Sequence, residues 1–189
     1  MNYQLQYNYC AIIIYVIILV SYLLKKRTKE IHNKVFTIIV IVSMIGAIVN
    51  VFNTAGNMKT LPMPHSLLVF LDYVYFIALN LSPFIYAIYA ITLTRKNLRT
   101  LNIKGKIMIF APVTFIWFML ITNPYSHMVF QYVDGVYTRG SSQFIMYVID
   151  LYYVAVGVLY VLREKDSTTL DLKISLAMFF IIGCTMAAI

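Results

Sequence analysis

Long apolar runs alternate with short polar segments along the 189 residues. An α-helix needs about 20 apolar residues to cross roughly 30 Å of hydrocarbon. Six runs approach that length, and they lie at Tyr9–Leu24, Val35–Asn53, Leu67–Thr94, Ile107–Ile121, Phe144–Leu162 and Ile174–Ile189. The opening MNYQLQYNYC has no basic residue ahead of its apolar run, so we expect a retained helix and not a signal peptide. The pattern predicts an all-α, polytopic membrane bundle of six transmembrane helices forming one domain over residues 1–189.

The longest polar interruption is Thr122–Ser142, TNPYSHMVFQYVDGVYTRGSS. In it, Asp134-Gly135 stands between aromatic and β-branched residues, which is a signal for a two-residue hairpin turn. The predicted strands are Val129–Val133 and Val136–Arg139. Asn123-Pro124 is predicted to end the fourth helix, because the residue before proline avoids the helical region. We therefore expect a short β-hairpin between the fourth and fifth helices.

Composition supports membrane insertion. The chain is 61% hydrophobic and 12% charged, with a mean hydropathy of +0.81, which excludes an ordinary soluble domain. The net charge of +8 comes from clusters that flank the apolar runs, so nucleic acid is not an expected partner. The loops KKRTKEIHNK, TRKNLRTLNIKGK and REKDSTTLDLK carry five, five and three Lys or Arg, whereas the two alternate loops carry one each. The positive-inside rule then predicts a multi-pass plasma-membrane protein with its N-terminus and hairpin outside.

The two cysteines, Cys10 and Cys184, have no metal or redox spacing, and both a disulfide and two separate thiols remain open. The sixth run has 16 residues after Lys173, or about 24 Å of helix. It would leave the chain on the outer side. We therefore expect a seven-helix bundle shortened after its sixth helix.

Two carboxylates fall within the predicted spans, where a charge at the helix centre costs roughly 3 kcal/mol or more. Asp72 lies 22 residues before Thr94, about 33 Å along a helix, which predicts an ordinary position near the outer interface. Asp150 lies 12 residues before Leu162, about 18 Å along a helix, which predicts a position inside the hydrocarbon. Asp150 is therefore the stronger candidate for a functional group.

Helical spacing gives each carboxylate a set of neighbours. Tyr147 shares the face of Asp150 and is expected to hydrogen-bond to it, and Gly157 on that face is expected to admit a close neighbouring helix. The face of Asp72 continues through Phe76, Asn80, Pro83 and Ala87, and Asn80 with Pro83 indicates a polar seam with a kink there. Two interpretations stay open. These groups either satisfy one another as packing contacts or line a cavity that binds a ligand from outside.

Several chemistries are excluded by what the runs contain. None has a central lysine for a retinal Schiff base, and all three histidines fall in predicted loops, so no intramembrane HExxH is present. No nucleotide-binding glycine motif occurs, and we expect no cofactor and no metal. His127, in the outer segment, is interpreted either as a loop anchor that caps a helix or as a ligand or metal contact.

The segment TNPYSHMVF, followed by DGVYTRG and a further helix, resembles the N-terminal seven-helix sensor region of bacterial histidine kinases and diguanylate cyclases. The matching residues are Asn123, Pro124, His127, Phe130, Tyr137 and Gly140. The start of the chain, with QYN at Gln6–Asn8, is similar to versions that precede GGDEF domains in Firmicutes. The resemblance implies a membrane input module that signals through its last helix to a cytoplasmic output domain. This sequence holds no seventh helix, GGDEF or kinase core, so we expect no catalysis from it alone.

The leading hypothesis is thus a sensory module that binds an extracytoplasmic or lipid-borne small molecule. The expected binding residues are Asp150, Tyr147, Asp72, Asn80 and His127, and the structural loop residues are Asn123, Pro124, Asp134, Gly135, Tyr137 and Gly140. Its expected partners are the bilayer, the output domain and a second copy of the chain. A small transporter with Asp150 as its coupling group is the alternative, and a scaffold subunit is a third interpretation.

Overall fold

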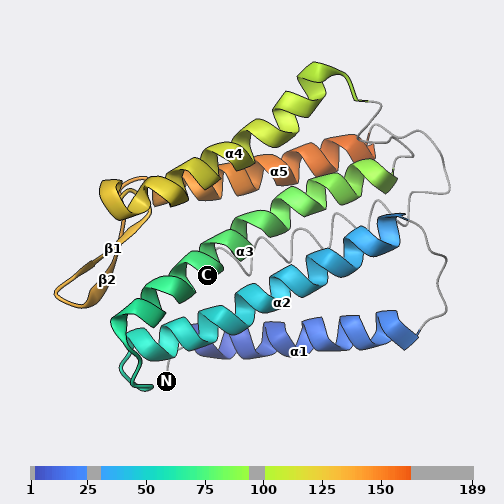
Figure 1. Cartoon of the computed structure of the whole chain (residues 1–189). Coiled ribbons are helices and arrows are strands. Elements are labelled where there is room, and N and C mark those ends of the chain that lie inside the picture. Colours follow the sequence, from blue (N-terminus) through green and yellow to red (C-terminus); the bar gives the residue numbers. More distant parts are fainter. Residues whose placement is uncertain (1–2, 25–30, 94–100, 163–189) are drawn as a thin grey trace.

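The computed structural model describes residues 3–24, 31–93 and 101–162. They form five helices and one hairpin, which run back and forth in chain order (Figure 1). The helices are α1 (Tyr3–Leu24), α2 (Ile31–Asn57), α3 (His65–Leu93), α4 (Ile103–Ser126) and α5 (Gln143–Leu162), and the strands are β1 (Phe130–Val133) and β2 (Val136–Arg139). The predicted sixth helix, Ile174–Ile189, and Cys184 lie outside the described residues.

All five helices are long and apolar enough to cross a membrane, which agrees with the prediction of a membrane helix bundle. Each begins before its predicted run, because polar residues continue the helix on that side. At the start of α4, for example, the Asn102 side chain accepts a hydrogen bond from the Gly105 N–H at 2.8 Å. Apolar runs therefore locate the helices, and at α4 a capping residue fixes the first turn.

Helix α3 is the centre of the bundle, with α2, α4 and α5 packed against it and α1 packed on α2. Small residues allow the close contacts. A Cβ at Gly46 of α2 would lie 3.2 Å from the Ala78 Cβ of α3, and one at Gly157 of α5 would lie 2.6 Å from the Tyr86 ring of α3. The predicted close approach at Gly157 is confirmed. A hydrogen bond of 3.1 Å from Ser43 to Ser82 adds a polar contact between α2 and α3.

Two tyrosines of α5 form hydrogen bonds with backbone groups of α4 around Pro112. Proline has no N–H, so the Met108 carbonyl four residues earlier loses its helical donor. The Tyr152 hydroxyl donates to that carbonyl at 2.9 Å. One residue on, the Tyr153 hydroxyl accepts from the Val113 N–H at 2.9 Å and donates to the Ile109 carbonyl at 2.7 Å. Helices α4 and α5 are thus joined by hydrogen bonds within the span, where no water is at hand to replace them.

Pro124 does not end α4 as predicted, and the helix continues to Ser126. Proline within the last turn removes only one helical hydrogen bond, and the His127 N–H still reaches the Asn123 carbonyl at 2.9 Å. His127 then closes the helix in the left-handed region, with φ 50° and ψ 26°. Its interpretation as a helix cap is confirmed.

The hairpin follows directly and has the expected two-residue turn. Val133 pairs with Val136, and both turn residues have positive φ, 52° at Asp134 and 75° at Gly135. Positive φ at both positions is what a type I′ turn requires. The hairpin lies at the same end of the bundle as the start of α1 and the connection between α2 and α3 (Figure 1).

Candidate functional site at the hairpin end

A buried carboxylate joins three elements at the hairpin end of the bundle. Asp72 of α3 is only 1% exposed. Its Oδ1 accepts a hydrogen bond from the Asn53 amide of α2, and its Oδ2 accepts one of 2.6 Å from the Tyr132 hydroxyl of β1. The prediction of an ordinary interfacial carboxylate was therefore wrong. Counting residues along the helix placed Asp72 at the correct end of α3, but the hairpin folds over that end and buries the side chain.

The polar network continues on α2. The Asn57 amide donates to Asn53 Oδ1 at 3.0 Å, and Asn57 Oδ1 lies 3.3 Å from the Tyr132 hydroxyl. Asp72 thus receives two donors, which suits an ionised carboxylate, because a buried charge is tolerated only when it is hydrogen-bonded. We call Asp72, Asn53, Asn57 and Tyr132 the latch, since together they connect the hairpin to α2 and α3.

Aromatic packing surrounds the latch. The Phe130 ring of β1 stacks on Phe76 of α3 at 5.6 Å and on Tyr137 of β2 at 6.2 Å, and meets Tyr73 edge-on at 5.1 Å. Tyr132 lies edge-on to the His65 ring at 4.8 Å. Phe130 belongs to the same buried cluster as Phe76, Leu120 and Met146, so the hairpin is an extension of the core.

Asn123 and Gly140 fix the hairpin to the end of α4. The Asn123 amide donates to the Phe130 carbonyl at 3.0 Å, and its oxygen accepts from the Val129 and Phe130 N–H groups at 2.8 and 3.3 Å. A Cβ at Gly140 would lie 2.2 Å from the Met128 carbonyl oxygen, so no larger residue fits without moving the backbone. Both residues, predicted as structural, hold the hairpin closed against the bundle.

The two hairpin tyrosines are held in their neutral form. Burial, followed by the hydrogen bond to Asp72, raises the pKa of the Tyr132 phenol above its ordinary value. Burial, followed by the nearby charge of Asp72, also raises the pKa of the Tyr137 phenol. At physiological pH the Tyr132 hydroxyl is therefore a stable donor to the carboxylate.

Asp150 is half-buried in α5, and the structure does not bring it to the latch. Its predicted hydrogen bond to Tyr147 is not formed. The Tyr147 hydroxyl instead accepts from the Gln143 amide at 3.0 Å, on the preceding turn, and the Tyr147 side chain is exposed. The Oδ1 atom of Asp150 is buried and has no hydrogen-bond partner among the described residues.

Two further buried acceptors belong to α3 and α5. Asn80 is buried, and its amide donates to the Phe76 carbonyl at 2.7 Å and contacts Met146 Sδ at 3.8 Å. Its Oδ1, like Gln143 Oε1, has no partner in the described part of the chain. Gln143, Met146 and Asp150 share one face of α5 by helical spacing, and Asn80 of α3 contacts Met146 on that face.

The remaining predicted residue, His127, is exposed at the end of α4 and does not join the other candidates. Across residues 3–24, 31–93 and 101–162, no group of three His, Cys, Asp or Glu is placed to hold a metal ion. His65, at the start of α3, is the histidine that contacts the site. Sequence reasoning missed it together with Asn53, Asn57 and Tyr132. The spacing of Asn53 and Asn57, one helical turn apart at the polar end of an apolar run, was the available signal.

Comparison with known proteins found no matching family model and no significant match among curated proteins or solved structures.

Proposed function

We propose that this chain is a membrane-embedded sensory input module. A signal taken up at the hairpin end, outside the plasma membrane, changes the positions of the helices. A sixth helix at Ile174–Ile189 and a cytoplasmic output domain complete the proposed path, and the positive-inside rule supports the N-out orientation.

The latch is the observation that carries this proposal. The Asp72 carboxylate of α3 accepts hydrogen bonds from Tyr132 of the hairpin and from Asn53 of α2. A displacement of the hairpin therefore acts on two spanning helices at once. A ligand that binds better when the hairpin is displaced shifts the bundle toward that arrangement, by as much as the difference in affinity allows.

The test measures the far end of the bundle when the latch is broken. Spin labels at Lys34→Cys on α2 and Lys104→Cys on α4, in a chain without Cys10 and Cys184, report the distance between two exposed sites opposite the hairpin. Tyr132→Phe is expected to shift or broaden the distance distribution. Tyr125→Phe is the matched control, because that side chain is 90% exposed. A distribution that Tyr132→Phe leaves unchanged would refute the coupling and with it this proposal.

The alternative function is a small transporter that uses Asp150 as its coupling group. Asp150 Oδ1, which has no partner among the described residues, favours it, because an ionisable group inside a span is typical of a proton or ion path. Uptake of protons or cations into proteoliposomes that is abolished by Asp150→Asn, and unaffected by the neighbouring Leu151→Ala, would support the transporter over the sensor.

A further inference from the structure

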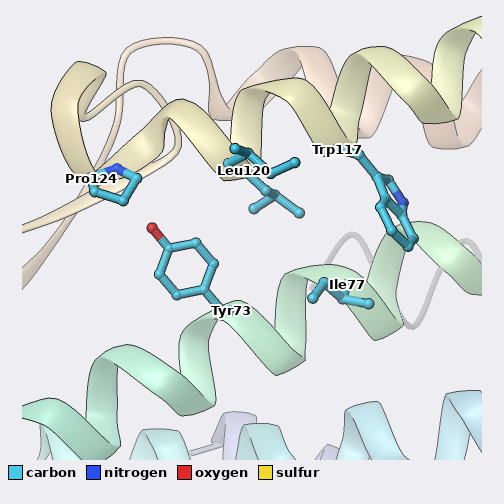
Figure 2. Close-up of a pocket in the computed structure, with 6 residues that line it drawn as sticks. Tyr73, Ile77, Trp117, Leu120 and Pro124 are labelled. Atoms are coloured by element: carbon cyan, nitrogen blue, oxygen red, sulfur yellow. The ribbon is translucent and has the colours of Figure 1, made fainter.

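A groove lies between α3 and α4, and one of its lining residues, Tyr73, follows Asp72 of the latch in the sequence. Its volume is about 330 Å³, within the range of small-molecule sites, roughly 300–1,000 Å³. Tyr73 projects from α3 toward Leu120 and Pro124 of α4, and Trp117 reaches down from α4 above Ile77 (Figure 2). Ile121 and Pro124 complete the lining.

The groove is apolar, and it opens on a membrane-facing flank. Ile77, Trp117 and Ile121 are all substantially exposed, whereas Leu120 is buried. The first three therefore form the mouth and Leu120 the floor. Both walls belong to helices that are long and apolar enough to cross a membrane, so we expect the hydrocarbon of the bilayer at the mouth. Tyr73 supplies the only hydroxyl in the lining.

Its lining suits a lipid chain better than a helix of a second copy. Helix contacts in membranes use Gly, Ala, Ser or Thr to let backbones approach. The lining residues are large and contain none of these. A flexible acyl chain needs neither small residues nor a wide channel.

We propose that the groove binds one acyl chain of a bilayer phospholipid and that its occupancy bears on the hairpin. This extends the proposed sensory function by naming the ligand class, and it rests on that function for its consequence. The path is short. In this proposal, Tyr73 contacts the acyl chain on one side, and its ring lies 5.1 Å from the Phe130 ring on the other. Leu120, which also lines the groove, belongs to the same buried cluster as Phe130. An acyl chain bound in the groove thus contacts the core residues against which the hairpin packs.

Trp117 makes the proposal measurable, because it is the only tryptophan in the 189 residues. The full chain is reconstituted in vesicles of phosphatidylcholine whose acyl chains carry bromine, a short-range quencher of tryptophan fluorescence. Ile77→Phe fills the groove and is expected to reduce the quenching of Trp117. Ile77→Ala widens the groove and is expected to preserve or increase it.

The matched control moves the tryptophan to the outer face of the same helix, with Trp117→Phe and Phe118→Trp, since Phe118 is exposed and does not line the groove. There, Ile77→Phe is expected to change nothing. Equal effects at positions 117 and 118, or no effect at 117, would overturn the proposal. Quenching that is weak in concentrated protein and rises when the protein is diluted with lipid would show a second copy on this face, and would also overturn it. Neither result depends on the distance measurement that tests the sensory function.

Discussion

At the scale of the residue, the decisive feature is how many donors each buried carboxylate receives. Asp72 has two, from Asn53 and Tyr132, whereas Asp150 Oδ1 has none within the described residues. A buried charge that loses one of its partners keeps the full cost of its desolvation. A substitution that removes a partner of Asp72 is therefore expected to destabilise the fold, and the proposed coupling role of Asp150 rests on its unpaired oxygen.

Tyr132→Phe is expected to destabilise the protein by about 1.5–3 kcal/mol, the range for a hydrogen bond to a charged group. The phenyl ring keeps its packing against His65, so only the hydroxyl is lost. Thermal unfolding in detergent measures the effect. Tyr125→Phe, at an exposed ring, is expected to leave the midpoint unchanged. Equal midpoints for the two variants would mean that the latch contributes nothing.

Alkaline pH is expected to destabilise the fold through the same contact. The pKa of Tyr132 and that of Tyr137 are raised by burial and then by Asp72, so the folded state keeps protons that the unfolded state loses above about pH 10. The contribution of these two tyrosines to the free energy of unfolding is fully present below that pH, and it is lost as the pH rises toward their raised pKa values. Thermal unfolding midpoints between pH 8 and 11 should decline less steeply in Asp72→Asn, because this substitution removes one of the two causes that raise the tyrosine pKa values. An identical slope would contradict the role of Asp72.

These residues also show what the sequence could predict. The turn at Asp134-Gly135 and the close approach at Gly157 follow from local rules, and the structure has them, whereas the local rule for Asn123-Pro124 placed the end of α4 too early. The burial of Asp72 does not follow from local rules. It depends on a tyrosine 60 positions later folding back over α3, and a pattern along one helix carries no information about such a contact.

At the scale of the element, the hairpin depends on one amide at the end of α4. Asn123→Ala is expected to leave the Phe130 carbonyl and the Val129 and Phe130 N–H groups without a partner, at about 1–3 kcal/mol for each group that stays unsatisfied. Hydrogen exchange at those two amides should accelerate. Thr122→Ala is the control, because that hydroxyl bonds only to carbonyls of its own helix, at Phe118 and Met119. Unchanged exchange in Asn123→Ala would show that the strands hold themselves closed.

The contact between α4 and α5 offers a test by rescue. Tyr152→Phe removes the donor to the Met108 carbonyl, which Pro112 leaves without a helical partner, and is expected to cost about 1–3 kcal/mol. In a Pro112→Ala background the new backbone N–H satisfies that carbonyl, so Tyr152→Phe should then cost little. Unfolding of the two single variants and the double variant gives the coupling energy. Purely additive effects would mean that the tyrosine does not compensate for the proline.

At the scale of the whole molecule, orientation in the membrane decides what the hairpin can meet. The start of α1, the connection between α2 and α3, and the hairpin share one end of the bundle, as alternating spans require (Figure 1). The two loops at that end carry one basic residue each, Lys59 and Arg139. The positive-inside rule therefore predicts that this end faces outward.

Thiol labelling in intact cells tests the orientation directly. In a chain with Cys10 and Cys184 replaced by alanine, Val136→Cys puts an exposed thiol on the hairpin and Lys104→Cys puts one at the opposite end. A membrane-impermeant maleimide is expected to label the first variant in intact cells and the second only after permeabilisation. The reverse pattern would place the hairpin and its latch in the cytoplasm. An extracytoplasmic signal could then not reach the latch, whereas a lipid chain in the groove between α3 and α4 could still act from within the bilayer.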